Sequence, residues 1–471
     1  MMKAFLSKVI TGRLALIESF FIVLFLGVQT APAALSFLSS TYAVGHSPVY
    51  VTVADVNNDG WLDLICANND DNTLTILTNN GGGIFGSNAT LNVGKGPECV
   101  IAADLRNQGQ VDLICANYGS GGGRTVTVLT NNDHGSFGSN TTVTVGFGPL
   151  CLVAVDIKGS GRLDVVTSNG GTNGTGNTLT ILTNNGSGLL VSNATVIVGT
   201  NPVFVVAADV NGDGRPDLIS ANNVSNSLSI LTNRGNARFS SQVTLPVSQP
   251  SCVAAANINA DGKPDLVCAS LSSSVVTLFT NNGSGQFVLQ TTLPMGNSLR
   301  GPIFPDALAV ADFDGDGRLD VAVANFTNVT KGVGALVIFT NNANYQLGSN
   351  ATINVGKFSV HVISADLNAD GKPDLVSVNL LDNTLTVLIN ANSFPSPAST
   401  PPLSLGFKNN ILNAIWPSAT PGWSLMQKSD LTNANWLASG NGGFQIVDDG
   451  TNKSLVLPAY ASSRFFRLMH P

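Results

Sequence analysis

The chain has 471 residues, of which 43% are hydrophobic and only 11% are charged, and its formal net charge is −7. Most of the Asp residues lie in the repeated segments described below and Glu occurs only twice, so the net charge says little about partners. The 22 Lys and Arg residues are scattered along the sequence, so no nucleic-acid partner is indicated. Only four His occur, and there is no Gly-x-Ser-x-Gly or His-Glu-x-x-His motif, so the sequence offers little support for a catalytic site.

Residues 1–33 are predicted to be a secretory signal peptide. Lys3, Lys8 and Arg13 precede an apolar run at 20–28, and Ala-Pro-Ala at 31–33 resembles a cleavage site. The apolar run is shorter than the roughly 20 residues that a membrane-spanning helix needs. No later segment is apolar enough to cross a bilayer, so the mature chain is expected to have no integral membrane segment. We expect it to be secreted, periplasmic or on the cell surface.

A nine-residue motif then occurs seven times, and successive copies begin 48 to 55 residues apart. A long, nearly constant period indicates one supersecondary unit that is repeated along the chain. The seven copies, numbered 1 to 7, begin at Asp55, Asp104, Asp156, Asp209, Asn257, Asp312 and Asp366.

Five of the seven copies carry the chemistry of a calcium loop. They place Asp or Asn at positions 1, 3, 5 and 9 and Gly at position 6, and calcium requires six to eight oxygen ligands from such a tight loop. The glycine permits a positive φ, so that the backbone carbonyl of position 7 can also face the ion. The EF-hand is excluded because position 12 is never Glu and the following residues are strand-like. The expected ligands are Asp55, Asn57, Asp59, Trp61 and Asp63; Asp209, Asn211, Asp213, Arg215 and Asp217; Asn257, Asn259, Asp261, Lys263 and Asp265; Asp312, Asp314, Asp316, Arg318 and Asp320; and Asp366, Asn368, Asp370, Lys372 and Asp374.

The copies are expected to differ in calcium affinity. Copy 6 supplies four carboxylates and should bind calcium most tightly, whereas copy 5 supplies two and should bind it most weakly. Copies 2 and 3 place Arg106 and Lys158 at position 3, so we expect no metal there and expect the basic side chain to fill the electrostatic role of the ion. About five calcium sites are therefore predicted. The alternative is plain turn chemistry, which favours Asp, Asn and Gly but does not require a carboxylate at position 9.

Each repeat also contains four short β-rich runs, as at 49–54, 62–67, 74–80 and 87–93. Four such runs in about 50 residues are typical of one β-propeller blade. Residues 34–394 are thus predicted to form an all-β, seven-bladed propeller. The last copy lacks a fourth run, whereas the segment 37–48 resembles the fourth run of copy 1. The N-terminal strand should therefore complete the seventh blade and close the ring.

Beyond the repeats, residues 395–402 form a Pro/Ser linker, which is semi-rigid by composition. Residues 403–471 hold three of the four Trp and several strand-like runs. They are predicted to form a small C-terminal β-domain resembling a β-sandwich. A role in sorting or surface attachment is the alternative to a plain β-domain.

The cysteines and histidines leave alternatives open. Cys99 with Cys115, and Cys252 with Cys268, occupy equivalent places on neighbouring strands and could form cross-strand disulfides. All six cysteines stand where other copies have apolar residues, however, which favours buried free thiols. Two histidines, 46 and 361, precede the first strands of blades 1 and 7. We expect two isolated surface side chains, with a metal or acid/base pair as the alternative.

The loops with the pattern D-x-[DN]-x-[DN]-G-x-x-D, together with Thr-Asn-Asn-Gly-type turns followed by Phe at 80–85 and 282–287, resemble the FG-GAP/VCBS-type repeat family. The resemblance covers about residues 35–394 and implies a calcium-binding, seven-bladed propeller like the heads of integrin α-subunits, here in a bacterial secreted protein. That family includes adhesion modules, lectin-like binders and domains appended to enzymes. The resemblance therefore indicates the fold and the metal better than the function.

A ligand is expected on the face opposite the calcium loops. There the connections between strands 2 and 3 of blades 2, 3 and 6, and the connection that precedes blade 6, vary in length. Variable loops on a rigid scaffold often carry recognition, although these could be tolerated insertions. They contain residues suited to sugars or proteins, namely Tyr118, Arg124, Arg300, Phe304, Phe326 and Lys331.

The expected function is that of a secreted, calcium-stabilised, non-enzymatic binding, adhesion or scaffold protein. Its partner would be a glycan or an extracellular or cell-surface protein. The alternatives are a propeller-type polysaccharide lyase or glycosidase, and a purely structural envelope protein.

Overall fold

The computed structural model describes residues 35–392, except 133, 241–242, 272, 296–302, 328–333 and 343, and within 404–469 only the strands. The predicted signal peptide and linker lie outside the described residues. So do Arg300, Lys331 and the side chains of Phe304 and Phe326.

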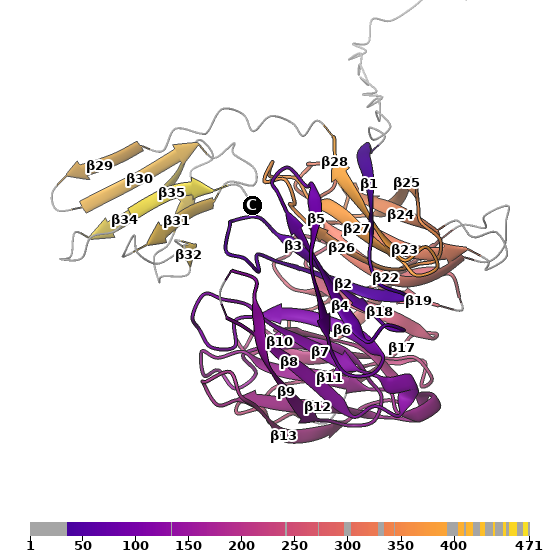
Figure 1. The fold of residues 1–471 in the computed structure, drawn as a ribbon. Coiled ribbons are helices and arrows are strands. Elements are labelled where there is room, and N and C mark those ends of the chain that lie inside the picture. Colours follow the sequence, from indigo (N-terminus) through magenta and orange to yellow (C-terminus); the bar gives the residue numbers. More distant parts are fainter. Residues whose placement is uncertain are drawn as a thin grey trace, which may run out of the picture. The chain divides into compact units, whose positions relative to one another are not determined.

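Seven four-stranded antiparallel sheets form the blades of a propeller (Figure 1). This confirms the predicted fold class. From the first strand to the fourth, blade 1 contains β2 Pro48–Ala54, β3 Asp63–Asn68, β4 Thr73–Asn79 and β5 Phe85–Asn92; blade 2 contains β6 Pro97–Ala103, β7 Asp112–Asn117, β8 Thr125–Asn131 and β9 Phe137–Thr144; and blade 3 contains β10 Pro149–Val155, β11 Asp164–Asn169, β12 Thr178–Asn184 and β13 Leu190–Ile197. Blade 4 contains β14 Pro202–Ala208, β15 Asp217–Asn222, β16 Ser227–Leu231 and β17 Val243–Pro246, and blade 5 contains β18 Pro250–Ala256, β19 Asp265–Ser270, β20 Val275–Asn281 and β21 Phe287–Pro294. Blade 6 contains β22 Ile303–Ala311, β23 Asp320–Thr327, β24 Gly334–Asn341 and β25 Leu347–Val355, and blade 7 contains β26 Ser359–Ala365, β27 Asp374–Asn379, β28 Thr384–Asn390 and β1 Phe37–Ala43.

The N-terminal strand closes the ring as the sequence predicts. Strand β1 pairs antiparallel with β28, from Phe37 opposite Asn390 to Ala43 opposite Thr384. In Figure 1 the indigo β1 lies beside the orange β28. The pairing completes the seventh blade and covers a strand edge that would otherwise be exposed.

Burial follows the order of strands within a blade. In β3, as in the second strand of most blades, every residue is buried, whereas the fourth strand β13 has only one buried residue, Leu190, and is otherwise exposed or half-buried. Hydrophobic clusters join neighbouring blades, so that the core lies between the sheets; one cluster contains Val56 of blade 1 and Val100 of blade 2. Two 3-10 turns, Gly119–Gly121 and Thr172–Gly174, lie in the second connections of blades 2 and 3. None of the described residues forms a helix with the length and hydropathy required to cross a membrane.

Seven strands follow the linker and pair into two sheets. One has the order β29-β30-β34-β33 and the other β32-β31-β35. The β-sandwich-like arrangement of this region stays a prediction. These strands are Ser404–Lys408, Ile411–Pro417, Ser424–Lys428, Leu437–Ala438, Ile446–Asp448, Asn452–Pro458 and Phe465–Met469.

Candidate calcium loops and binding face

All seven nine-residue segments form the loop between the first and second strands of a blade, and in the six copies that begin with Asp the loop is built around this side chain. In copy 1 the carboxylate of Asp55 accepts the backbone N–H groups of Asp59 at 3.1 Å and of Gly60 at 2.8 Å. Gly60 has φ 91° and Asn58 has φ 60°. The predicted positive φ at position 6 is confirmed, and it requires glycine because a side chain is rarely tolerated in that conformation. The orientation of the position-7 carbonyl toward an ion stays a prediction.

Position 4 also adopts a positive φ, which the sequence pattern does not reveal. It is Asn or Gly in five copies, which suits this conformation, but Ala260 and Ala369 adopt it with φ 57° and 55°. A non-glycine residue in this region is strained unless the surroundings impose it. The loop geometry is thus maintained by the contacts around it and not by local preference alone.

The aspartate at position 9 joins the loop to the rest of its blade. Its side chain is at most 1% exposed in all seven copies. In copy 1 one oxygen of Asp63 accepts the N–H of Val56 at position 2, and the other accepts the N–H of Asn79 at the end of the third strand. The corresponding bond to the third strand occurs in every blade, at 2.7 to 3.0 Å.

The same asparagine links its blade to the nine-residue loop of the preceding blade. The Nδ2 group of Asn281 donates to the carbonyl of Val210, in the loop of copy 4, at 2.8 Å, and to Pro264 of its own loop at 3.0 Å. All seven blades have this inter-blade hydrogen bond, at 2.6 to 3.0 Å. The bond from Asn79 of blade 1 to the carbonyl of Leu367 in the loop of copy 7 completes the ring. Every loop is therefore part of a blade interface.

The loop carboxylates experience burial and mutual repulsion. Burial raises the pKa of Asp320 to about 8, although backbone N–H groups of Asn341 and Phe313 oppose the rise, and the charges of Asp314 and Asp312 add to it. Burial likewise raises the pKa values of Asp63, Asp314 and Asp374 to about 6. A bound cation would favour the charged carboxylates that burial disfavours.

Two observations test whether the loops fit a calcium ion. In copy 6, Asp312, Asp314 and Asp320 each have a carboxylate oxygen within 4.8 Å of those of the other two. In copy 5, the buried Oδ1 of Asn257 has no hydrogen-bond partner, while the aspartates at this position elsewhere accept backbone N–H groups. Clustered carboxylates and an unpartnered amide oxygen both suit a hard cation. The residues present therefore fit calcium.

Positions 5 and 7 form ion pairs in four of the five loops. In copies 4, 6 and 7 the carboxylate at position 5 lies close to the basic side chain at position 7, with 2.9 Å for Asp213 and Arg215 and 3.3 Å for Asp370 and Lys372. In copy 5 the corresponding distance is 3.8 Å. A carboxylate here has one oxygen toward the basic side chain, so its participation in metal binding stays a prediction.

In copies 2 and 3 a basic side chain does reach the buried aspartate. The guanidinium of Arg106 lies 2.9 Å from Asp112 and also donates to the carbonyl of Asn131 at 2.6 Å. The ammonium of Lys158 lies 3.7 Å from Asp164. A protein cation thus faces the position-9 carboxylate in both loops, as the sequence suggests.

Asp314→Asn provides a test of copy 6, because Asn occupies position 3 in the other four intact copies. We expect the variant to lower calcium affinity at this loop by about tenfold, since one carboxylate is lost. We expect the calcium-free protein to become more stable, since the crowded charge is removed. Calorimetric calcium titration and chelated thermal unfolding measure the two effects. Gln108→Ala, in the loop of blade 2, should change neither; equal effects of both substitutions would contradict the assignment.

The histidines do not form a pair. His46 is exposed and its Nδ1 lies 2.9 Å from Asp71. His361 is only 6% exposed and its ring lies 3.8 Å from that of Tyr50. The expectation of two surface histidines is thus wrong for His361, because the third residue of β26 faces the neighbouring blade.

All six cysteines are buried and free. The predicted burial is confirmed. Cys99 lies opposite Ala116, and Cys115 lies opposite Val100. The two thiols therefore face opposite sides of the sheet and cannot form a disulfide, and the same register separates Cys252 from Cys268.

The opposite face of the propeller carries the second and fourth connections of each blade. There the guanidinium of Arg124 lies 4.2 Å from the ring centroid of Phe147, which is 49% exposed. Tyr118 is half-buried beside the 3-10 turn of blade 2, and Thr172 of blade 3 donates to Gly121 of that turn at 3.0 Å. Two predicted long connections are thus packed together next to an arginine–phenylalanine pair that the sequence pattern did not identify.

Phe304 and Phe326 belong to strands, although the sequence places them in connections. They are direct partners in the pairing of β22 with β23. Aromatic residues favour strand pairing, which extends this hairpin beyond the predicted boundary.

Leu381 and Val224, in the turns between the second and third strands of blades 7 and 4, are 51% and 54% exposed and were not predicted.

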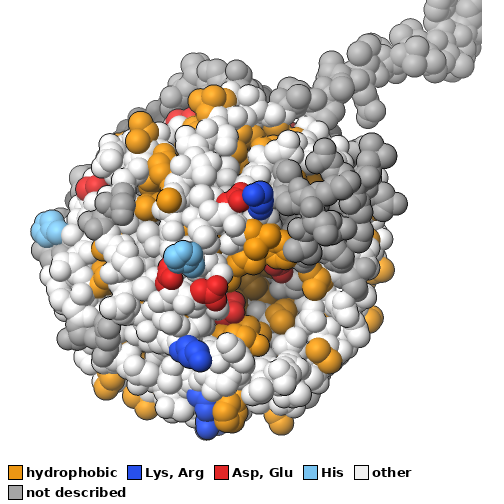
Figure 2. All heavy atoms as spheres, turned by 45° about the vertical axis from the view of Figure 1, so that its right-hand side comes forward, with side chains coloured by type: hydrophobic (Ala, Val, Ile, Leu, Met, Phe, Trp, Pro, Cys, Tyr) orange, Lys and Arg blue, Asp and Glu red, His pale blue; other side chains and the backbone are white. Residues whose placement is uncertain are grey.

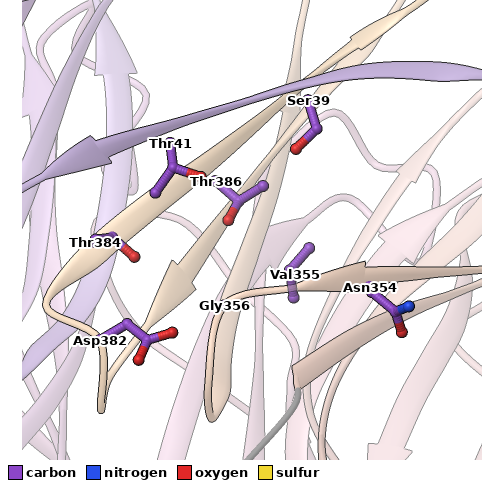
Figure 3. Close-up of a pocket in the computed structure, with 8 residues that line it drawn as sticks. All are labelled: Ser39, Thr41, Asn354, Val355, Gly356, Asp382, Thr384 and Thr386. Atoms are coloured by element: carbon purple, nitrogen blue, oxygen red, sulfur yellow. The ribbon is translucent and has the colours of Figure 1, made fainter.

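A polar cleft of about 450 Å³ lies between the outer parts of blades 6 and 7 (Figure 3). Asp382 and Asn354 flank it, and hydroxyl groups come from two adjacent strands of blade 7. Its lining residues are Ser39, Thr41, Asn354, Val355, Gly356, Asp382, Thr384 and Thr386.

Comparison with known proteins agrees with this geometry. The structure of BBS1N in complex with ARL6DN, soaked with lead, has a TM-score of 0.53 and 13% identity over 78% of this chain and 99% of that one. The same complex soaked with mercury has a TM-score of 0.54 and 13% identity over 77% and 98%. A functionally unknown protein from Desulfotomaculum acetoxidans DSM 771 has a TM-score of 0.47 and 14% identity over 66% and 87%. For the two BBS1N complexes, an identity of 13% shows a similar fold and nothing more.

No curated protein matches the chain significantly. The family profile described as FG-GAP-like repeat matches residues 55–115, 156–220, 209–268, 257–323 and 312–377. Each matched stretch begins at the first residue of a loop of the kind described above, and together they cover more than half of the chain. The chain therefore belongs to the family of FG-GAP-like repeat proteins.

Proposed function

We propose that this protein is a calcium-stabilised, non-enzymatic binding or adhesion protein that engages the surface of another protein. The observation that carries the calcium part is the cluster of Asp312, Asp314 and Asp320 in a loop that is hydrogen-bonded to blades 6 and 7. The ion would neutralise buried carboxylates and fix the loop. Calcium thus serves the scaffold, and recognition is left to the opposite face.

Exposed apolar side chains support a protein partner on the face opposite the loops. Phe147 with its stacked Arg124, together with Val224 and Leu381, gives aromatic, basic and aliphatic groups on connections of three blades. Such groups are enriched in protein interfaces. Figure 2 shows few and separate Lys and Arg side chains on one side of the molecule, which offers no basic surface for a polyanion. BBS1N, whose fold is similar, is in complex with a protein.

A glycan is the second candidate partner, and the cleft of Figure 3 favours it. Its hydroxyl groups, with the carboxylate of Asp382 and the amide of Asn354, are the types of groups that bind sugar hydroxyls. A glycan array with the mature protein and the variant Asp382→Ala would detect this activity. Release of reducing ends from any polysaccharide on such an array would instead support an enzyme.

The binding face can be tested by substitution. We expect Arg124→Ala combined with Phe147→Ala to weaken capture of a protein partner at least tenfold, because an exposed aromatic anchor is removed. Ile84→Ala is the matched control, since Ile84 is 62% exposed in a turn on the calcium face. Cross-linking of envelope proteins to the immobilised protein, followed by mass spectrometry, measures the loss. Equal capture by both variants would place the site elsewhere.

Export follows from the proposed signal peptide. We expect a chain expressed with residues 1–33 in a bacterial host to leave the cytoplasm and to begin near residue 34. Cell fractionation and N-terminal sequencing check this. A protein that keeps residues 1–33 and stays in the cytoplasm would contradict it.

A further inference from the structure

Three of the buried cysteines lie at the same register in the innermost strands. In every first strand the pairing register shifts after a proline or, in blade 7, after Ser359, and pairing resumes two residues later. In blades 2, 3 and 5 the residue at which pairing resumes is Cys99, Cys151 or Cys252, and each is at most 2% exposed. Only blades 2 and 3 are adjacent, so only Cys99 and Cys151 can be neighbours on adjacent strands.

The thiol of Cys99 reaches across the blade interface to the strand that carries Cys151. The Sγ atom of Cys99 accepts the N–H of Leu152, the residue after Cys151, at 3.3 Å. The Cys151 thiol itself donates to the carbonyl of Val205 in blade 4 at 3.8 Å, so it has to rotate toward Cys99 for a bond to form. The remaining thiols at this level are separated from them; Cys252 lies two blades away from Cys151, with the Phe204 position of blade 4 between them. The geometry therefore singles out one pair.

We propose that Cys99 and Cys151 form a disulfide between blades 2 and 3 when the chain folds in the presence of a small-molecule disulfide. One cysteine thiolate attacks the small-molecule disulfide, forms a mixed disulfide and releases one thiol. The second cysteine thiolate then attacks the protein sulfur of that mixed disulfide and releases the second thiol. Two protein thiols are oxidised, two small-molecule thiols are produced, and the two protons pass to solvent or to the departing thiolates.

The bond has to form before the interface is complete. Burial raises the pKa of the Cys99 thiol well above its usual range, so Cys99 holds little thiolate in the folded protein, and both cysteine side chains are shielded from solvent. Blades 2 and 3 are also the two whose loops carry Arg106 and Lys158 in place of metal-ligating residues. The disulfide would link the blades to which calcium contributes least, and it does not depend on calcium binding elsewhere.

The test is refolding of the full chain with oxidised glutathione, followed by thiol counting in denaturant and by peptide mapping. We expect free thiols to fall from six to four and a linked peptide pair containing Cys99 and Cys151. The thermal midpoint should rise by several degrees relative to the reduced protein. Six free thiols, or a different linked pair, would overturn the proposal. Because this measurement uses the unaltered chain, it remains valid even if a variant fails to fold.

Two matched variants complete the test. Cys115→Ala should still form the linked pair, because Cys115 faces the other side of the sheet. Cys151→Ala should retain all its remaining thiols and lose the redox-dependent rise in thermal midpoint. If Cys151→Ala still loses two thiols on oxidative refolding, another pair is responsible and the assignment is wrong.

Discussion

Chelation of calcium should lower the thermal midpoint of the propeller by roughly 9 °C, the largest effect that we predict. With a dissociation constant of ~0.1 mM per site, millimolar calcium stabilises the fold by about 1.4 kcal/mol per site. Five sites together give about 7 kcal/mol, and an unfolding entropy of about 2.1 cal/mol/K per residue over the propeller converts this into the midpoint shift. Thermal unfolding followed by circular dichroism, with calcium or with chelator, measures it.

Magnesium is the control for this experiment. It is smaller than calcium and loses its water ligands reluctantly, so it should restore little of the lost stability. Restoration by calcium alone would show a specific site and not a general effect of ionic strength. An unchanged midpoint after complete removal of calcium would exclude a structural role for the metal.

Asn281→Ala and Asn184→Ala should each destabilise the protein by about 2–4 kcal/mol, because both substitutions remove two donors from buried carbonyls. The side chain of Asn281 donates to Val210 in the loop of copy 4, which is a proposed calcium site. That of Asn184 donates to Leu105 in the loop of copy 2, where Arg106 replaces the metal. The two variants are therefore matched in structure and differ in the loop that they loosen.

Only Asn281→Ala should also reduce the calcium-dependent part of stability, by up to about 1.4 kcal/mol. Chemical unfolding of both variants with calcium and with chelator separates the two effects. A calcium-dependent loss of the same size in Asn184→Ala would show that the inter-blade hydrogen bonds do not transmit the state of the loop. A stability equal to that of the unaltered protein would show that these bonds contribute nothing.

Much of the fold could be predicted because the repeat places the same information in the chain seven times. The period of 48 to 55 residues predicts the blades, and the missing fourth run of the last copy predicts the closing strand that pairs with β28. The exchange of an oxygen ligand for Arg106 or Lys158 predicts a protein cation at the buried aspartate, and both side chains are found there. These are local patterns whose physical meaning does not depend on distant residues.

Other features could not be predicted because they arise where blades meet. The asparagine at the end of each third strand reads as turn chemistry, yet its amide hydrogen-bonds to the loop of the preceding blade. The burial of His361 follows from its contact with Tyr50, which is distant in the sequence. Phe147 pairs with Arg124 across two connections of blade 2 and the start of blade 3. Single-sequence patterns contain no information on which side of a blade such residues face.

Calcium titration of the metal-free protein by isothermal calorimetry is the most direct test of the central claim that the loops hold metal. About five ions per chain should bind, and Asp312→Ala should remove the tightest of them while Gln108→Ala leaves all of them in place. A heat signal indistinguishable from dilution, or the same binding curve for Asp312→Ala as for the unaltered protein, would contradict the assignment of calcium to these loops.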